Sequence, residues 1–432
     1  MDIAGKKVTI IGGKRSGMAL ARLVIRLNGK VQLSEKDSED CLPHEFKSWA
    51  AQHNVSFEFN GHTPEFVTNS DVIVLSPGVP FDSKCVRWAQ EKNICVCGEI
   101  EFAAQFCSKP IIAVTGSNGK TTVATLISKI FQKAGHQVCL CGNVGFPFSE
   151  FACDLAHVDY VVLELSSFQL ESVHDSSLPT SEGSMSVEGF KPYISVILNF
   201  SQNHLDRHKD LEEYFAAKKR IAINQSSEDF CVLNHKDPES HTMPPKIEAQ
   251  VVYFNSDDEM TVSNPNHSAV LAVGQICSVD KDLCHKVFKE FEGVEHRLEK
   301  VRSLNGIDFI NDSKATTAQA ALWALENIEQ PILMICGGRD KNIDFSVLGE
   351  TVQQKVKQMF VIGEARAKIR KAFDELINLE ECDGLEEAIT KARQNASKGD
   401  CVLLSPMCTS FDMFADFEER GRVFKKIVNN LT

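Results

Sequence analysis

The sequence predicts an α/β protein with three domains, each built on a mostly parallel sheet. Short apolar runs rich in β-branched residues alternate with helical patterns along all 432 residues. Polar or glycine-rich loops follow the runs that are predicted as strands, as is typical of α/β folds. At about 150 residues per domain, the length allows three domains with separate cores. We expect them at residues 1–98, 99–294 and 295–432.

The composition argues against two classes of protein. The chain carries 46 basic and 59 acidic residues, which leaves a formal net charge of −13 at pH 7. Such an acidic balance is not typical of proteins that bind nucleic acid or a membrane surface. No apolar run approaches the ~20 residues of a membrane span, and no signal peptide is recognised. We therefore expect a cytoplasmic protein without membrane insertion.

Fifteen cysteines are spread through the apolar runs. An odd number in a large chain without an export signal indicates reduced thiols rather than a disulfide framework. Two pairs, Cys95 with Cys97 and Cys139 with Cys141, are each separated by one residue. They lack partner ligands nearby in sequence, so alternating positions on a strand are the favoured interpretation over a metal site.

The first segment opens with a strand at residues 7–11, a glycine loop and a helix. Lys14 stands where the dinucleotide-binding fingerprint has its second glycine, which makes a dehydrogenase the weaker interpretation. Binding of another nucleotide fits better, because Gly12 and Gly17 still open a helix N-terminus toward a phosphate. The rigid turn at residues 76–80 follows a buried strand and is expected at the same edge of the sheet as the glycine loop.

The most informative stretch lies at residues 111–122. A β-branched run ends in Gly-Ser-Asn-Gly-Lys-Thr-Thr, and a helical pattern follows. This order of strand, loop and helix predicts a phosphate-binding loop. Its glycines let backbone N–H groups approach a polyphosphate, its lysine reaches the outer phosphates, and its threonine hydroxyl can bind Mg²⁺. The loop is shorter than the common Walker pattern, because Val114 replaces the first glycine. Its residues are Gly116, Ser117, Asn118, Gly119, Lys120, Thr121 and Thr122.

Two polar side chains follow other strands of the central segment. Glu164 lies near the end of the buried run 160–165, where a carboxylate is costly unless it is paired or binds a cation. Beside a phosphate loop, Mg²⁺ is the natural partner. His204 falls just past the strand at 193–198. A lone histidine is usually structural, but this one shares a sheet edge with Lys120 and Glu164, so we assign it to the site.

The last segment alternates strands and helices again and carries a second polar edge. Loops at residues 311–317, 337–341 and 405–411 follow predicted strands. Lys314, Lys341 and the loop hydroxyls are suited to holding an anionic small molecule.

Together these stretches resemble the Mur ligases of bacterial cell-wall synthesis over nearly the whole chain. The phosphate loop marks a superfamily that also contains folylpolyglutamate synthetases. The run Glu-Leu-Ser-Ser-Phe-Gln-Leu at 164–170 and the run Phe-Glu-Glu-Arg-Gly at 417–421 are narrower and favour the D-glutamate-adding branch. The other matching stretches are residues 116–121, 204–208, 217–221, 295–297, 311–316, 337–341, 404–406 and 410–414.

The resemblance implies a Rossmann-like N-terminal domain for a UDP-linked substrate, a central P-loop mononucleotide-binding ATPase domain, and a Rossmann-like C-terminal domain for the amino acid. It implies that ATP, with two Mg²⁺ ions, drives the joining of D-glutamate to UDP-N-acetylmuramoyl-L-alanine through an acyl phosphate. A monomer is expected.

The resemblance also assigns residues. Lys120 would hold the ATP phosphates, Thr121 and Glu164 one Mg²⁺, and His204 the second Mg²⁺ together with Lys218. Without the resemblance, Lys218 belongs to a solvated helix face. The resemblance makes it a carbamate, which offers Mg²⁺ anionic oxygens where a bare ammonium would repel it. Contacts to the nucleotide are implied for Asn264, Arg297 and Asp312. Contacts to the UDP-linked substrate are implied for Ser16, Ser34, Lys36, Gly78, Asn143 and Ser166. Contacts to D-glutamate are implied for Thr316, Lys341, Ser410 and Phe417.

Three features depart from the family pattern, and three alternatives stay open. Ser263 precedes Asn264 where the family has histidine, and residues 175–189 form an insertion without a counterpart. The acidic contact to the nucleoside lies among residues 34–36 without being fixed to one of them.

An amide ligase for a different amino acid is the nearest alternative function. A P-loop switch or motor ATPase would leave the N-terminal and C-terminal polar edges unexplained. A nucleotide-sugar binding module without catalysis is disfavoured by the presence of Lys120, Glu164 and His204.

Overall fold

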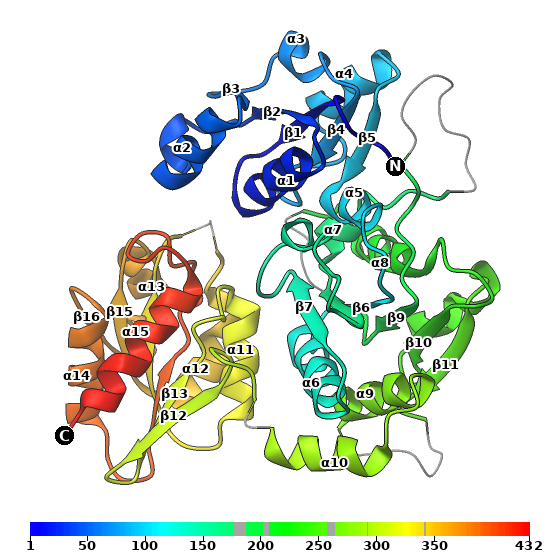
Figure 1. The fold of residues 1–432 in the computed structure, drawn as a ribbon. Helices are drawn as coiled ribbons and strands as arrows, with labels where there is room; N and C mark the ends of the chain where they lie inside the picture. Colours follow the sequence, from blue (N-terminus) through cyan, green and yellow to red (C-terminus); the bar gives the residue numbers. More distant parts are fainter. Residues whose placement is uncertain (177–186, 202–206, 257–263, 292, 341–342) are drawn as a thin grey trace. The chain divides into compact units, whose positions relative to one another are not determined.

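The computed structural model describes residues 1–176, 187–201, 207–256, 264–291, 293–340 and 343–432. The chain divides into two compact units, Met1–Phe291 and Glu292–Thr432. The described strands form three sheets, two in the first unit and one in the second (Figure 1). The α/β fold class is thereby confirmed, with one sheet in each expected segment. The boundaries expected after residues 98 and 294 stay predictions.

The first sheet has five parallel strands in the order β3-β2-β1-β4-β5. The strand order reverses between β1 and β4, and ligands of such sheets bind outside the carboxyl ends at this point. The strands are β1 Lys7–Ile11, β2 Lys30–Ser34, β3 Ser56–Glu58, β4 Val72–Leu75 and β5 Cys95–Gly98. The helices are α1 Arg15–Arg26, α2 His44–Gln52, α3 Pro64–Val67, α4 Lys84–Glu91 and α5 Glu99–Ala104.

The second sheet has six parallel strands in the order β11-β10-β9-β6-β8-β7. The central strand β6 leads into the phosphate loop, and β8 and β9 flank it. The strands are β6 Ile111–Thr115, β7 Val138–Gly142, β8 Tyr160–Glu164, β9 Ile194–Ile197, β10 Phe230–Asn234 and β11 Gln250–Phe254. The helices are α6 Lys120–Lys133, α7 Ser167–Leu170, α8 Leu211–Lys219, α9 Pro265–Ile276 and α10 Lys281–Glu290.

The third sheet has the order β12-β13-β17-β14-β15-β16 and is parallel except for the antiparallel edge pair β12 and β13. The strands are β12 Glu299–Leu304, β13 Ile307–Asn311, β14 Ile332–Gly337, β15 Val356–Ile362, β16 Asn378–Glu381 and β17 Cys401–Leu404. The helices are α11 Ala318–Asn327, α12 Gly349–Lys355, α13 Arg366–Phe373, α14 Leu385–Asn395 and α15 Phe417–Asn430. Single turns of 3₁₀ helix lie at Glu39–Cys41, Phe148–Glu150, Arg220–Ala222, Pro238–Thr242, Pro244–Lys246 and Ser346–Leu348.

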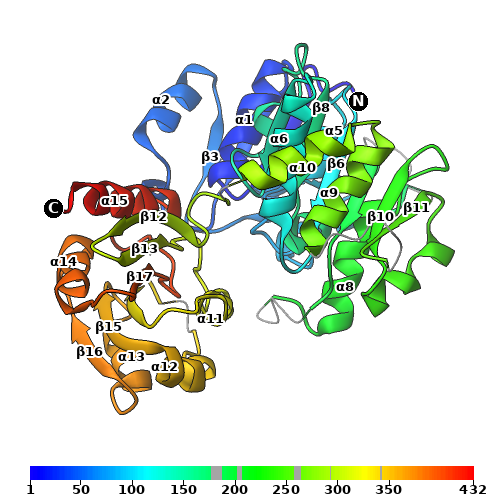
Figure 2. The ribbon, with the colours of Figure 1, turned by 90° about the horizontal axis from the view of Figure 1, so that it is seen from below.

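Helices cover both faces of the third sheet, which explains why its strands are apolar throughout. Along β14, Met334 packs on one core with α11, α12 and α13, whereas Ile335 packs on another with α14 and α15. Figure 2 shows strands of this sheet between α15 and the pair α12 and α13. Because successive side chains on a strand point to opposite faces, a strand covered on both sides needs a continuous apolar run.

Two expectations from composition can be compared with the structure. All fifteen cysteines fall within the described residues and carry free thiols. The pairs Cys95 with Cys97 and Cys139 with Cys141 lie in β5 and β7, which confirms their interpretation as strand residues. Among the described residues, no helix combines the length and apolar character that a membrane crossing requires.

Candidate active site

The phosphate loop joins β6 to α6 through two glycines in the left-handed region. Gly116 has φ +153° and Gly119 has φ +83°. A Cβ on Gly119 would lie 2.5 Å from Oδ1 of Asn266, which would have to move, and the positive φ would strain any other residue here. Lys120 begins α6 and folds back over the loop, where its Nζ donates to the carbonyls of Gly116 at 2.8 Å and Ser117 at 3.0 Å. The loop therefore presents one ammonium at a helix N-terminus.

Asn199, two residues after the end of β9, holds the phosphate loop through two hydrogen bonds. Its carbonyl accepts from the amide of Ser117 at 3.0 Å, and its Oδ1 accepts from the amide of Asn118 at 2.8 Å. Thr121, whose hydroxyl was predicted to bind Mg²⁺, is buried in the first turn of α6, and Thr122 follows it half-buried. The position of Asn199 just past a strand was visible in the sequence, but no pattern distinguished it from its neighbours.

Glu164 ends β8, and only one of its two carboxylate oxygens accepts a hydrogen bond from the described residues. The side chain is 1% exposed. Its Oε1 accepts from Nδ2 of Asn143 at 2.7 Å, and its main-chain carbonyl accepts from the amide of the same asparagine at 2.8 Å. Its Oε2 is buried and has no hydrogen-bond partner among the described residues. Such an oxygen is costly unless a cation reaches it. Ser166, two residues later, caps α7 through Gln169.

Lys218 is buried against the phosphate loop. It lies in the last turn of α8 with 1% of its surface exposed. Its Nζ donates to the carbonyl of Gly116 at 3.0 Å and lies 4.5 Å from the ring centroid of Tyr214. Burial, with the nearby charge of Lys120, lowers the pKa of Lys218 well below its usual range. The interpretation of Lys218 as part of a solvated helix face is therefore wrong.

Two assigned residues, His204 and Lys341, lie outside the described residues, as does most of the expected insertion at 175–189. Asn264, assigned to the nucleotide, is exposed at the N-terminus of α9. Its Oδ1 accepts from the amide of Asn266 at 2.9 Å and so caps this helix. Its role toward a nucleotide stays a prediction.

A pocket of about 610 Å³ opens at the carboxyl ends of the first sheet. Three of the residues assigned to the UDP-linked substrate line it: Ser16, Lys36 and Gly78. Ser34 does not line it, because its hydroxyl is buried and donates to Oε2 of Glu58 at 2.6 Å. Of residues 34–36, Glu35 supplies the acidic group in the lining, and its Oε2 accepts from the amide of Gly13 at 2.6 Å.

The second unit brings Arg297 and Asp312 to the end of β13. Asp312 is 3% exposed; its Oδ1 accepts from the amide of Leu298 at 3.2 Å and its Oδ2 from the hydroxyl of Ser405 at 3.0 Å. Burial raises the pKa of Asp312 to about 7, against the opposing effects of these hydrogen bonds and of the Arg297 charge. The guanidinium of Arg297 also lies 5.2 Å from the ring centroid of Trp323.

The loops assigned to the amino acid are joined by a buried arginine. Arg420, 1% exposed, donates to the carbonyl of Ser313 at 2.9 Å and to that of Cys408 at 3.2 Å. These loops carry Thr316, which is half-buried, and Ser410, which is 2% exposed. Phe417 begins α15, and Nζ of Lys314 lies 5.8 Å from its ring centroid.

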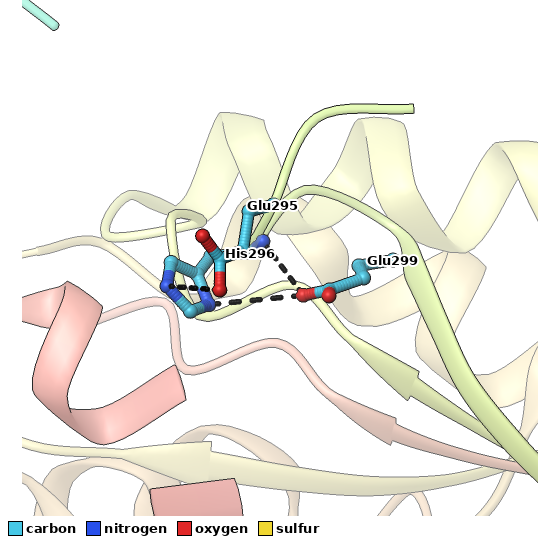
Figure 3. Close-up of side chains that lie close together, drawn as sticks. All are labelled: Glu295, His296 and Glu299. Carbon is cyan, nitrogen blue, oxygen red and sulfur yellow. Dashed lines mark hydrogen bonds and ion pairs between the residues drawn. The ribbon is translucent and has the colours of Figure 1, made fainter. Parts of the chain in front are cut away.

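A group of three titratable side chains in the second unit has the spacing of a metal site. Possible ligand atoms of Glu295, His296 and Glu299 all lie within 4.8 Å of one another (Figure 3). However, Nζ of Lys425 lies 3.0 Å from Oε1 of Glu295 and 2.5 Å from Oε1 of Glu299. The Nδ1 of His296 faces Nδ2 of Asn311 at 2.8 Å. Because the ammonium of Lys425 already pairs with both carboxylates, we interpret the group as an ion-pair network.

Comparison with known proteins gives matches along the whole chain. Residues 7–85 match the MurD N-terminal domain, residues 114–281 the Mur ligase middle domain, and residues 296–408 the Mur ligase, glutamate ligase domain. The UDP-N-acetylmuramoylalanine–D-glutamate ligase of Thermoanaerobacter sp. (strain X514) is 36% identical, with 100% of both chains covered. The corresponding ligase of Chloroherpeton thalassium is 37% identical, covering 100% of this chain and 99% of that one. The chain belongs to the Mur ligase family.

Solved structures of Mur ligases share this fold. The UDP-N-acetylmuramate-alanine ligase MurC of Thermotoga maritima gives a TM-score of 0.57 at 17% identity, covering 98% of this chain and 99% of that one. MurF ligase of the same organism, solved in complex with ADP, gives 0.55 at 16% identity, covering 93% and 95%. At this identity the likeness concerns the fold alone.

Within this Mur ligase fold, the structure brings together four assigned residues of the second sheet: Lys120, Thr121, Glu164 and Lys218. Lys120 and Thr121 begin α6 after the loop that follows β6, Glu164 ends β8, and Lys218 lies in the last turn of α8 with its Nζ bonded to the loop at Gly116. Arg297, Asp312, Thr316, Ser410 and Phe417 belong to the second unit, which is a separate body. The sequence missed Asn199 and the buried role of Arg420, because no periodicity marks a residue that holds other loops.

Proposed function

We propose that the protein is an ATP-dependent ligase that adds D-glutamate to UDP-N-acetylmuramoyl-L-alanine in the synthesis of peptidoglycan precursors. The observation that carries this proposal is a buried lysine, Lys218, bonded to the phosphate loop at Gly116, together with the buried, unbonded Oε2 of Glu164 at the end of the neighbouring strand. The full-length relatives, which bear the name of this ligase, support the choice of substrates.

The phosphate loop is the proposed ATP site. Its backbone N–H groups and the N-terminus of α6 favour an anion, and Lys120, whose Nζ donates to the carbonyls of Gly116 and Ser117, adds a positive charge at the loop. Asn264, Arg297 and Asp312 are proposed contacts to the nucleotide. A triphosphate on this loop would give the ammonium of Lys120 anionic oxygens in place of main-chain carbonyls.

The donor set fits magnesium. The buried Oε2 of Glu164 is an orphan acceptor, and the Thr121 hydroxyl lies on the first turn of the neighbouring helix. These two would hold one Mg²⁺, and His204 with a carbamate on Lys218 would hold a second. The lowered pKa of Lys218 supports the carbamate, since a neutral amine is the form that adds carbon dioxide. When bound, Mg²⁺ supplies positive charge that offsets the repulsion between a carboxylate and a triphosphate.

The reaction would have two steps. The carboxylate of the UDP-linked substrate attacks the γ-phosphorus of ATP, so that a carboxylic–phosphoric anhydride forms and ADP leaves. The amine of D-glutamate then attacks the carbonyl carbon, and phosphate leaves as the C–O bond breaks. Lys120 is placed to stabilise the charge that develops on the transferred phosphoryl group.

The polar edges of the first and third sheets would each hold one substrate. The pocket of about 610 Å³ in the first sheet has the size of a small-molecule site, and it would take the nucleotide end of the UDP-linked substrate through Ser16, Lys36 and Gly78. Ser34 would support its wall, while Asn143 and Ser166 would contact the part nearer the phosphate loop. Thr316, Lys341, Ser410 and Phe417 would hold D-glutamate. A monomeric, cytoplasmic enzyme is part of the proposal.

One assay separates this function from the alternatives. Phosphate release from ATP is measured with UDP-N-acetylmuramoyl-L-alanine, with and without D-glutamate, L-glutamate or another amino acid. The proposal expects release that requires both the UDP-linked substrate and D-glutamate. Release with a different amino acid would favour another amide ligase, and release without either substrate would favour a switch or motor ATPase.

A further inference from the structure

Three arginines of α1 lie on one face of the helix, because Arg15, Arg22 and Arg26 are spaced by seven and four residues. This face, here called the arginine face, contacts a short segment beyond β7. Arg22 Nη1 lies 3.4 Å from Oε2 of Glu150, and Arg26 Nη2 donates to the carbonyl of Glu150 at 2.6 Å. The N-terminus of α1 borders the pocket of the first sheet, and its arginine face thereby connects this helix to the segment that follows β7 of the second sheet.

Arg15 contacts the loop that directly follows β7. Its Nη2 donates to the carbonyl of Gly145, and its guanidinium carbon lies 5.6 Å from the ring centroid of Phe146. That ring is 58% exposed. The planar guanidinium can donate to a carbonyl while its flat face stacks on a ring, a geometry that the tetrahedral ammonium of lysine does not have.

The same loop is tied to Glu164 at its other end. The amide of Gly142 donates to the carbonyl of Phe146 at 2.8 Å and so closes the loop on itself. Asn143 then holds Glu164 through the two hydrogen bonds described above. A Cβ on Gly142 would lie 2.5 Å from the Glu164 carbonyl, so the loop packs tightly on the end of β8. A short chain of contacts thus runs from Arg15 to the Glu164 carboxylate.

We infer that Arg15 is a positioning residue for Glu164. By fixing Gly145 and Phe146, it holds the loop in the conformation that presents Asn143 to Oε1, which leaves Oε2 as the free oxygen. Arg15 also lines the pocket of the first sheet beside Ser16. The residue therefore links the pocket for the UDP-linked substrate to the carboxylate beside the phosphate loop. The role of Glu164 in this inference rests on the proposed function. The chain of contacts from Arg15 to Glu164 is independent of that function.

The competing explanation is that Arg15 only adds positive charge to the pocket. Lys14 provides a matched comparison, because it lines the same pocket and carries the same charge. Its Nζ pairs with Oδ2 of Asp37 at 3.4 Å, on the first sheet. Lys14→Ala therefore removes the charge and leaves the loop contact, and Arg15→Lys keeps the charge and removes the planar donor.

The first measurement is amide hydrogen exchange in the intact protein without ligands. The amide of Gly142 donates within the loop to the carbonyl of Phe146, and that of Asn143 donates to the carbonyl of Glu164. The amide of Ser149 is bonded separately to Oε1 of buried Glu99 at 2.8 Å. In Arg15→Ala and Arg15→Lys, we expect Gly142 and Asn143 to exchange about tenfold faster while Ser149 keeps its rate. In Lys14→Ala, all three should exchange as in the unmodified protein.

The second measurement is Mn²⁺ binding in the presence of ADP, followed by electron paramagnetic resonance, which requires no turnover. Arg15→Ala should weaken Mn²⁺ binding about tenfold, because a metal ligand would lose its support. Lys14→Ala should leave Mn²⁺ binding unchanged. Unchanged exchange in both Arg15 variants, or equal effects of Arg15→Ala and Lys14→Ala on Mn²⁺ binding, would overturn the inference. If the unmodified protein made no amide but the exchange pattern appeared as expected, the contact chain would stand and the proposed function would fail.

Discussion

The Nζ atom of Lys218 donates a hydrogen bond to the carbonyl oxygen of Gly116 at 3.0 Å. Nζ of Lys120 donates to the same oxygen at 2.8 Å. Burial and the nearby charge of Lys120 lower the pKa of Lys218 well below its usual range, which favours the neutral amine over a second ammonium on this carbonyl. The neutral amine can take up carbon dioxide, and the resulting carbamate would place a negative charge near the ammonium of Lys120.

Replacing Lys218 therefore gives the first prediction. Lys218→Ala should lose at least ~10²-fold in turnover, by analogy with the loss of other groups that support a metal site. Short carboxylic acids should restore part of the activity by supplying anionic oxygens. Lys218→Arg should be inactive, since a guanidinium does not take up carbon dioxide. The matched control is Lys219→Ala on the same helix, where Nζ pairs with Glu239 at 2.8 Å. An active Lys218→Arg variant would contradict the carbamate.

The second prediction concerns Lys120. Lys120→Ala should lower kcat about 10³-fold, the scale found when one preorganised stabilising group is removed, while the melting temperature changes little. Lys133→Ala, at the other end of α6 and 61% exposed, should leave kcat unchanged. Steady-state kinetics with both variants provides the check. Near-normal turnover by Lys120→Ala would show that ATP does not use this loop.

The third prediction concerns the choice of amino acid. Ser410→Ala should raise KM for D-glutamate and leave KM for ATP within twofold, because Ser410 lies on a loop of the second unit and the phosphate loop lies in the first. Loss of one hydrogen bond to a charged ligand corresponds to roughly tenfold in KM. Substrate titrations measure both constants. A rise in KM for ATP alone would mean that the amino-acid pocket has been misplaced.

The fourth prediction concerns the stability of the second unit against pH. The folded pKa of Asp312, about 7, lies above its ordinary value of 3.8. Between these values the folded form holds a proton that the unfolded form has lost, so the free energy of unfolding falls as pH rises from about 4 to about 7. The scale is ~1.4 kcal/mol for each pKa unit. In Asp312→Asn, this part of the pH dependence should disappear from urea unfolding followed at pH 5 and pH 8. An identical slope in both proteins would contradict the shift.

The sequence predicted the α/β fold because each strand is an apolar run followed by a polar loop. It also located the phosphate loop and Glu164, since a lysine after glycines and a carboxylate in a buried strand have few structural explanations. It did not reveal the burial of Lys218. Helical spacing places Lys218 on the same face of α8 as Tyr214, but a lysine on such a face usually extends to solvent. Its burial depends on the distant loop at Gly116. Asn199 and Arg420 were missed for the same reason, because both act on loops far away in sequence.

The measurement that tests the central proposal most directly follows oxygen atoms. UDP-N-acetylmuramoyl-L-alanine labelled with ¹⁸O in its carboxylate is converted with ATP and D-glutamate, and the released phosphate is examined by mass spectrometry. The acyl-phosphate route predicts one ¹⁸O atom in each phosphate, together with one amide bond. Phosphate without label, released whether or not D-glutamate is present, would contradict the assignment of this protein as an amide-forming ligase.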